Sequence, residues 1–293
     1  MAYADAQQAV LGRWDLVVQT PGGEQPAWME LRRSGPRAVV GQFVGWHGSA
    51  RPISRVDVRA DGLHFAIPPQ YEPGEGDLTL EGQLQGDQLR GTIVTPDGRT
   101  ITWSGRRAPV LRRAVPPTWG EPITLFNGVD LAGWHVIQGA SQWEVADGIL
   151  RNVKPGGNLV TDQQFEDFQL HIEFRYGPKG NSGVYLRGRY EVQVLDGPSE
   201  EPDSHLQGGI YGFLTPSAIV TNGPGEWNTF DITLVGRQVT IVVNGTTVIS
   251  EQAIPGITGG ALDSDEGAPG PLMLQGDHTA IEYRNIVLTP AIG

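Results

Sequence analysis

The chain has 293 residues, no cysteine, 41 glycines, 22 prolines and a formal net charge of −12. The missing thiols exclude disulfides, thiolate nucleophiles and cysteine-ligated metal centres, and the acidic charge argues against nucleic acid or an anionic membrane surface as a partner. Many turn-forming residues between short Val, Ile and Thr runs predict an all-β protein of one or two domains.

The first residues, Met-Ala-Tyr-Ala-Asp, give no sign of a targeting segment. They lack the basic and apolar regions of a signal peptide, and the chain has no run of about 18 apolar residues that could span a bilayer. We expect a periplasmic or secreted protein if a signal peptide has been removed, and a cytoplasmic protein otherwise. A short, weak helical pattern covers residues 4–11.

Short strand patterns recur through the first part of the chain. Turn signals such as Asp61-Gly62 and Asp97-Gly98 separate them, and Asp-Gly between alternating apolar runs is typical of a hairpin. The expected strands are Gly12–Gln19, Ala27–Arg33, Ala38–Trp46, Ser54–Arg59, Gly62–Ile67, Leu78–Gln85, Gln88–Thr95 and Arg99–Gly105. They predict a small antiparallel barrel-like domain over residues 1–108.

Four large side chains stand out in this first domain: Trp28, Trp46, His47 and Tyr71. They could line a ligand pocket, or they could plug the barrel and cap its ends. We favour the structural role, because no group of side chains in this domain has a catalytic pattern.

A composition shift marks the end of the first domain. Residues 106–122 carry four arginines and four prolines without apolar alternation. Proline fixes φ and cannot donate to a strand ladder, so this segment predicts an extended linker over residues 109–122. A second domain should then occupy residues 123–293.

The second domain is again rich in strand patterns. Asn244-Gly245 lies between two of them and is the preferred two-residue hairpin turn. The expected strands are Trp143–Val145, Ile149–Asn152, Asn158–Thr161, Phe168–Tyr176, Val184–Leu195, Gly209–Tyr211, Asn228–Val235, Gln238–Val243, Thr246–Glu251, Pro271–Gln275 and Ile281–Leu288. So many strands in one domain predict a two-sheet jelly-roll sandwich.

The run from Asn181 to Asp196 has the most informative pattern. Read as one strand with a period of two, it has one apolar and one polar face. The polar face carries Tyr185, Arg187, Arg189, Glu191 and Gln193. Two guanidiniums, a carboxylate, an amide and a phenol suit a polyhydroxylated ligand such as a sugar.

Several motifs follow one another in the second domain. They are Phe126-Asn-Gly-Val-Asp130, Leu131-Ala-Gly-Trp134, Trp143-Glu-Val-Ala-Asp-Gly148, Asp167-Phe-Gln-Leu-His-Ile-Glu-Phe-Arg175, Glu226-Trp-Asn-Thr-Phe-Asp231 and Arg284-Asn-Ile286. Together with the polar run they resemble the 3-keto-disaccharide hydrolase domain family, over residues 121–290. The resemblance implies a concanavalin A-like jelly roll and does not extend to the first domain.

The resemblance also implies a chemistry. The substrate would be a 3-keto-glycoside, a small oxidised sugar whose C3 ketone acidifies the hydrogen on C2. A base could then drive elimination of the C1 substituent, and hydration would complete a net hydrolysis. No cofactor is certain, although a divalent metal such as calcium or manganese is compatible with stabilising the enolate. Sugar 3-oxidoreductases would be functional partners.

Carboxylates and histidines are the candidates for proton transfer. Glu191 is the first choice, with a structural ion pair as its alternative, and His205 is the best histidine because it lies in a loop. Glu173 shares a face with His171 and Arg175. If that strand paired with the polar run, these side chains would face the same groove, and Glu173 would be a second catalytic carboxylate.

The remaining candidates would hold the substrate. They are Tyr185, Arg187, Arg189, Gln193, Arg175 and His278; His278 matches a family motif near the last strands, whereas His135 is expected to be structural. Arginine forks suit vicinal oxygens, but Arg187 and Arg189 could instead pair with Glu173 and Glu191. Trp227 could pack in the core or stack on a sugar.

The acidic run from Asp263 to Glu266, together with Asp196 and Asp203, raises the question of a calcium site. We favour a solvated loop, since no EF-hand pattern is present, and the identity of any metal stays unknown. Two rival functions also stay open. One is a non-catalytic, lectin-like carbohydrate-binding protein; the other is an ordinary glycosidase using Glu173 and Glu191 as its carboxylate pair.

Overall fold

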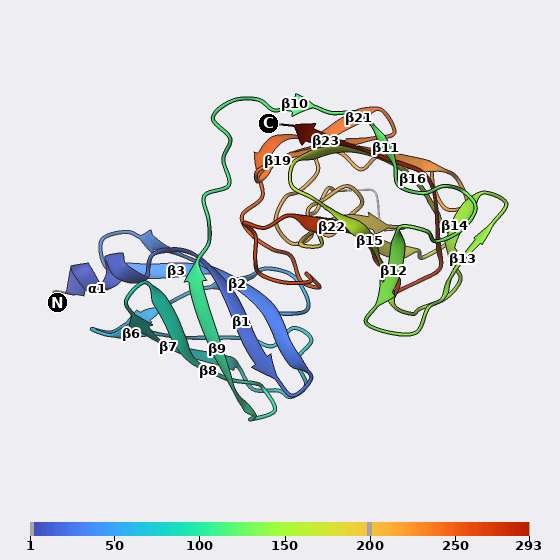
Figure 1. The fold of residues 1–293 in the computed structure, drawn as a ribbon. Coiled ribbons are helices and arrows are strands. Elements are labelled where there is room, and N and C mark those ends of the chain that lie inside the picture. Colours follow the sequence, from blue (N-terminus) through green and yellow to red (C-terminus); the bar gives the residue numbers. More distant parts are fainter. Residues whose placement is uncertain (1–2, 198–200, 293) are drawn as a thin grey trace. The chain divides into compact units, whose positions relative to one another are not determined.

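The structure, a computed structural model, describes residues 3–197 and 201–292 and contains two compact units (Figure 1). The first unit comprises Met1–Val110 together with the distant segment Gly256–Glu266. The second comprises Leu111–Pro255 and Gly267–Gly293. Each unit has its own sheets, and we describe them separately.

The first unit holds one helix, α1 (Tyr3–Val10), and a nine-stranded antiparallel sheet ordered β4-β3-β2-β1-β9-β8-β7-β6-β5. Its strands are β1 (Gly12–Thr20), β2 (Gly23–Ser34), β3 (Ala38–Val44), β4 (Arg51–Ile53), β5 (Asp57–Val58), β6 (Gly62–Ile67), β7 (Leu78–Gln85), β8 (Gln88–Val94) and β9 (Thr100–Arg107). Consecutive strands pair through short turns nearly throughout, as the Asp-Gly signals predict.

This sheet curls around an apolar core. Trp14 and Leu16 of β1 are fully buried in this core, together with Phe43 and Phe65. The alternate residues of β1 point to the opposite face of the sheet. The amide of Val56, just before β5, donates to the carbonyl of Val39 on β3 at 2.8 Å. Among the described strands no ladder joins β4 to β5, so the expected closure into a barrel is not confirmed.

The second unit holds two further sheets. Their strands are β10 (Thr118–Trp119), β11 (Ile123–Thr124), β12 (Trp134–Ile137), β13 (Trp143–Ala146), β14 (Ile149–Asn152), β15 (Asn158–Phe165), β16 (Phe168–Tyr176), β17 (Asn181–Leu186), β18 (Tyr190–Leu195), β19 (Asn228–Val235), β20 (Gln238–Val243), β21 (Thr246–Ala253), β22 (Gly270–Leu274) and β23 (Ile281–Ile292). The nine-stranded sheet runs β13-β14-β23-β16-β19-β20-β21, with β10 and β11 also paired to β23. The five-stranded sheet runs β12-β15-β22-β17-β18.

The core of this unit draws side chains from both sheets. Phe174 and Phe230 of the larger sheet meet at a ring-centroid distance of 4.4 Å, and Val184 and Val192 of the smaller sheet are fully buried. The all-β expectation is therefore confirmed, and the two sheets agree with a jelly-roll sandwich. None of the helices in the described part of the chain is long and apolar enough to cross a membrane.

The expectation of one long strand from Asn181 to Asp196 is wrong. The chain forms a hairpin, in which β17 and β18 pair antiparallel with Leu186 opposite Tyr190. Arg187 and Gly188, in the turn that joins β17 to β18, both have positive φ, at 52° and 65°. Positive φ is uncommon for arginine, so residue type alone does not predict this turn.

Candidate active site

The hairpin gathers three of the predicted polar side chains. Tyr185 on β17 lies opposite Glu191 on β18, and Gly183 lies opposite Gln193. Val184, Val192 and Val194 occupy the other face and are fully buried. Because paired residues of a hairpin point to the same face, Tyr185, Glu191 and Gln193 meet on the outer face of the five-stranded sheet.

Glu191 is at the centre of this group. The hydroxyl of Tyr185 donates to its Oε2 at 2.9 Å, and the amide of Gln193, oriented to satisfy its hydrogen bonds, donates to its Oε1 at 3.3 Å. The residue is 4% exposed. Burial raises the pKa of Glu191 to about 8, against the opposing effect of the Tyr185 hydrogen bond. A carboxyl with such a pKa can exchange a proton near neutral pH.

Tyr185 serves this carboxyl as a hydrogen-bond donor. Burial, together with the adjacent Glu191, raises the pKa of Tyr185 well above its ordinary value. The phenol therefore keeps its proton over the physiological range.

A histidine–aspartate pair stands beside Glu191. Asp277 and His278 lie shortly after the end of β22. Between them and the strand, the backbone amide of Gln275 donates to the backbone carbonyl of Gly183 on β17 at 2.9 Å. The ring Nδ1 of His278 lies 2.6 Å from Asp277 Oδ1. This hydrogen bond raises the pKa of His278, against burial, and Glu191 contributes through its charge. The pair thus favours an imidazolium that is electrostatically coupled to the Glu191 carboxyl.

The predicted loop around His205 borders the same hairpin. Its backbone runs along β18. The backbone amide of Gly208 donates to the backbone carbonyl of Gln193 at 2.9 Å, and that of Tyr211 donates to the backbone carbonyl of Glu191 at 3.1 Å. The ring of His205 packs edge-on against Tyr211, with centroids 4.9 Å apart. The predicted strand here reduces to isolated bridges of Ile210. His205 therefore lies near the site through Tyr211, with no direct contact to Glu191 among the described interactions.

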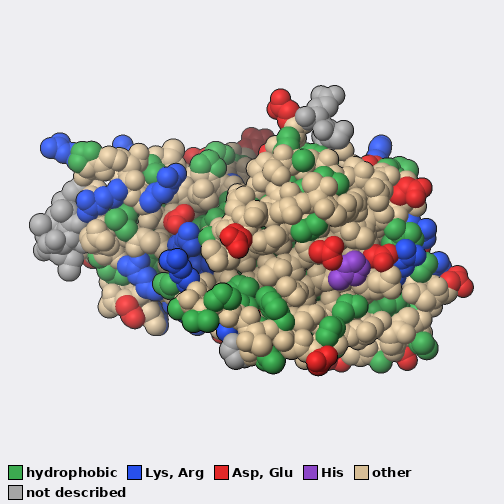
Figure 2. Space-filling view, turned by 90° about the horizontal axis from the view of Figure 1, so that it is seen from above, with side chains coloured by type: hydrophobic (Ala, Val, Ile, Leu, Met, Phe, Trp, Pro, Cys, Tyr) green, Lys and Arg blue, Asp and Glu red, His purple; other side chains and the backbone are tan. Residues whose placement is uncertain are grey.

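Each of these surface histidines carries an aspartate on its Nδ1. His205 lies 2.5 Å from Asp203, and His135, His171 and His278 each lie 2.6 Å from theirs. The face drawn in Figure 2 shows a histidine beside acidic side chains. The pairing by itself does not distinguish a catalytic histidine. What distinguishes His278 is its electrostatic coupling to the buried Glu191.

The two arginines of the polar run are not brought to Glu191. Arg187 Nη2 donates to the carbonyl of Gly236 at 2.6 Å and to the hydroxyl of Tyr190 at 3.3 Å. Arg189 Nη1 donates to the carbonyl of Ala268 at 2.8 Å. Both are buried in the turn, so placing them on one strand face with Glu191 was wrong. Their contacts fix neighbouring loops.

Glu173, His171 and Arg175 belong to the other sheet. Their strand, β16, pairs with β19 and β23, whereas β17 pairs with β18 and β22. The assumption that the two strands pair is therefore wrong, and Glu173 does not form a carboxylate pair with Glu191. Arg284 Nε and Asn285 Nδ2 each donate to Glu173 at 2.6 Å.

Trp227 lies in the same outer network. The guanidinium of Arg284 stacks 4.0 Å from its ring centroid, and that of Arg175 lies at 4.7 Å. Arg175 also pairs with Glu282 at 2.5 Å. These contacts account for the polar side chains of β16 as part of a stabilising network around the indole.

We expect Glu173→Gln to leave turnover unchanged and to lower the free energy of unfolding by about 1 kcal/mol, because the neutral amide loses the ion pair with Arg284 and its single oxygen can accept from only one of the two donors, Arg284 and Asn285. Burial would raise the pKa of Glu173, but the bonds from Asn285 and Arg284 outweigh it and lower the pKa. The stabilisation is thus present above the unfolded-state pKa and is lost as pH falls through the folded-state pKa. Denaturant titrations at neutral and acidic pH should show the difference shrinking. If Glu173→Gln lost its turnover, Glu173 would have a role in the active site, against this prediction.

The acidic run does not form the expected solvated loop. Glu266 is fully buried, and Asp265 pairs with Arg106 at 2.6 Å in the first unit. Within the described residues no group of three or more His, Asp or Glu side chains could hold a metal ion.

Sequence reasoning did not assign Asp277 and Tyr211. Asp277 could have been found from its position immediately before His278, since an aspartate beside a histidine orients the ring and raises its pKa. Tyr211 gives no comparable local signal, because its neighbourhood depends on how its loop lies along β18. Trp28, Trp46, His47 and Tyr71 do not form a cavity together: Trp28 is fully buried and Tyr71 is 66% exposed.

The comparisons agree with this architecture. Among solved structures, a glycosyl hydrolase candidate from Parabacteroides distasonis is 33% identical, with 61% of this chain and 93% of that one covered and a TM-score of 0.51. A second from the same organism is 23% identical, with 57% and 92% covered and a TM-score of 0.49. A comparison with curated proteins gave no match.

The 33%-identical glycosyl hydrolase neighbour and the family match support a carbohydrate-related function for this unit. The family model of the 3-keto-alpha-glucoside-1,2-lyase-like domain matches residues 121–289, more than half of the chain. The chain belongs to this family, which confirms the resemblance predicted from its motifs.

Proposed function

We propose that this protein is an enzyme that cleaves 3-keto-glycosides by elimination and hydration, with Glu191 as the proton-transferring base. The observation that carries the proposal is the buried Glu191 carboxyl, whose pKa is raised to about 8 beside the Asp277–His278 pair. Family membership supplies the substrate class. An ordinary glycosidase would need a second carboxylate across the same groove, and Glu173 lies on the other sheet.

The first step removes a proton from carbon. The C3 ketone acidifies the C2 hydrogen; Glu191 takes this proton, and the C–H electron pair forms the C1=C2 double bond. The C1–O bond breaks with its electrons, and the leaving oxygen takes up a proton. Water then adds to C1 of the enone while a proton returns to C2, which gives a free 3-keto-sugar. The two steps together consume one water, as in hydrolysis.

The neighbouring groups have distinct roles in this scheme. Tyr185 and Gln193 hold the carboxyl of Glu191 by donating to its two oxygens. His278, kept protonated by Asp277, supplies the positive charge or the proton that the developing oxygen anion requires. His205 and Tyr211 border the hairpin and would contact the sugar rather than the reacting carbon. No step is assigned to a metal.

The substrate class places the enzyme within a reaction sequence. A glycoside acquires a C3 ketone only by oxidation of its C3 hydroxyl, so an oxidoreductase must supply the substrate. The released 3-keto-sugar would be reduced by an enzyme of the same class. These partners are part of the proposal.

We expect a bell-shaped pH dependence of kcat/KM, because Glu191 must be ionised while His278 must be protonated. In His278→Gln the falling limb at high pH should disappear, and the remaining, lower activity should rise through a single midpoint above pH 8, because the charge of His278, which lowers the wild-type pKa of Glu191 to about 8, is lost. The measurement is kcat/KM between pH 5 and about 10 on a 3-keto-glucoside. A variant that keeps the falling limb would remove His278 from the acid role.

Elimination also leaves an isotopic trace that direct hydrolysis lacks. When the reaction runs in D₂O, the product should carry deuterium at C2, since the proton on C2 is removed and replaced. Product without deuterium at C2 would contradict the proposed route. If the sugar binds without any cleavage, the lectin-like function gains the support instead.

A further inference from the structure

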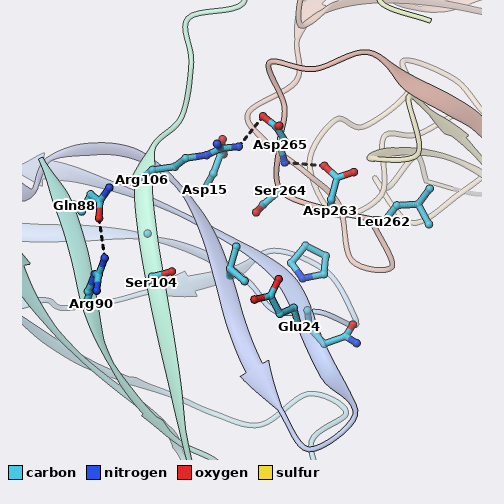
Figure 3. Close-up of a pocket in the computed structure, with 14 residues that line it drawn as sticks. Asp15, Glu24, Gln88, Arg90, Ser104, Arg106, Leu262, Asp263, Ser264 and Asp265 are labelled. Carbon is cyan, nitrogen blue, oxygen red and sulfur yellow. Dashed lines mark hydrogen bonds and ion pairs between the residues drawn. The ribbon is translucent and has the colours of Figure 1, made fainter. Parts of the chain in front are cut away.

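The first unit contains a cavity of about 480 Å³ that holds none of the residues discussed above for catalysis (Figure 3). We propose that this cavity is an accessory binding site for a small neutral or cationic sugar. The inference does not depend on the cleavage chemistry, because every residue that lines the cavity belongs to the first unit.

The floor of the cavity is the outer face of the curled sheet. Asp15 of β1 lies opposite Arg106 of β9, and in the next row Val17 lies opposite Ser104. Arg90 of β8 extends that row beside Ser104. The residues between them, such as Trp14 and Leu16, point into the core, so strand alternation alone gives the floor its polar character.

The roof is the segment Gly256–Glu266, which comes from the sequence between β21 and β22. Two glycines let it approach the sheet closely: a Cβ on Gly256 would lie 2.2 Å from the indole of Trp28, and one on Gly259 would lie 1.9 Å from the carbonyl oxygen of Gly48. Any side chain at these positions would therefore lift the roof. The fit leaves Trp28 fully buried, although it belongs to the outward row of β2.

Polar contacts hold the roof above the cavity. Arg106 reaches from β9 to Asp265, with Nη2 and Oδ1 2.6 Å apart, and the amide of Asp265 donates to Asp263 at 2.7 Å. Figure 3 shows both contacts, with Ser264 between the roof and the strands and Glu24 on the opposite side of the space. These contacts come from the chain itself and fix the roof, which lowers the entropic cost of binding.

The lining defines the ligand class. Apolar atoms make up most of the exposed lining, as in most ligand pockets, and charged side chains lie among them. Three carboxylates, from Glu24, Asp263 and Asp265, line the cavity with the two guanidiniums of Arg90 and Arg106, whereas the oxygens of Asp15 are buried. Carboxylates and arginine forks are suited to vicinal hydroxyls. The excess of one carboxylate favours a neutral or amino sugar over an anionic one. The volume lies within the usual range for small-molecule sites, roughly 300–1,000 Å³.

The test is a binding titration on the full chain carrying Glu191→Gln, so that turnover cannot interfere. The probes are methyl glucoside, glucosamine and glucuronate. Binding of each is measured from the changes in the backbone amide chemical shifts of the protein. We expect the first two to perturb residues around Ser104 and Arg90, and glucuronate to bind more weakly. Arg90→Ala should weaken binding by roughly tenfold, as loss of one charge-assisted hydrogen bond implies, and the cavity-filling Ser104→Trp should abolish it.

Arg33→Ala is the matched control, because Arg33 is an exposed arginine of the same sheet that does not line the cavity. Thermal unfolding of each variant checks that the fold is kept. Shifts confined to residues near position 191, equal affinity in wild-type and Ser104→Trp cavities, or tighter binding of glucuronate would each overturn the proposal. Failure of the 3-keto-glycoside reaction would leave these outcomes unaffected.

Discussion

Replacing Glu191 by glutamine should lower kcat on a 3-keto-glycoside by about 10³-fold, within the range that a general base contributes. Glutamine keeps the shape of the side chain and can still accept the hydrogen bond from Tyr185, but it cannot take up the C2 proton. The measurement is steady-state product release by wild type and variant at pH 8, where wild-type Glu191 is about half ionised.

The same substitution should leave the fold intact. The folded-state pKa of Glu191 is raised to about 8, so the native carboxyl is destabilising when ionised, and this cost grows as pH rises from the unfolded-state pKa to about 8. Glutamine carries no such charge, and we expect its Tm at pH 8 to equal or exceed that of wild type. Retained turnover would refute the role of Glu191, and an unfolded variant would refute this account of its environment.

Gly183→Ala should cost the enzyme about 10- to 100-fold in kcat without unfolding it, since displacing a catalytic group by about 1 Å can have such an effect. A Cβ at position 183 would lie 2.3 Å from Glu191 Oε1 and 2.8 Å from its Cγ. The carboxyl must therefore move from its place between Tyr185 and Gln193. Alanine is otherwise tolerated in a strand, and Gly183 has no positive φ.

Gly177→Ala is the matched control, because its Cβ would meet nothing within 4 Å and its φ is likewise not positive. It should keep full activity. In the Glu191→Gln background Gly183→Ala should cost nothing further, since the group that it displaces has already lost its function. Full activity of Gly183→Ala alone, or an additive loss in the double variant, would contradict a direct steric effect on Glu191.

Period-two alternation predicted the central group of the site although the strand assignment was wrong. In the β17–β18 hairpin Tyr185 pairs with Glu191 and Gly183 with Gln193, so odd-numbered residues share a face on both strands. Arg187 and Arg189 fell outside this rule because they form the turn. Asn and Gly, by contrast, are the residue types that favour positive φ, and Asn244 and Gly245 have φ values of 48° and 79°. The hairpin that they form was predicted correctly.

Long-range pairing was beyond the reach of local patterns. Nothing in Phe168–Tyr176 tells the reader that this strand joins β19 and β23 rather than β17, because its alternation fits any neighbour with an apolar face. The packing of the segment Gly256–Glu266 could not be predicted from local patterns either. Its glycines resemble those of a solvated loop, and their function in close packing against Trp28 and Gly48 becomes visible only in the structure.

The most direct test of the central claim compares a 3-keto-disaccharide with its unoxidised parent, each incubated with wild-type protein with and without a chelator. The account predicts that the 3-keto-disaccharide is cleaved with and without chelator and that the parent stays intact, because only the ketone acidifies the C2 hydrogen that Glu191 removes. Cleavage of the parent at a comparable rate, or of neither sugar, would contradict it.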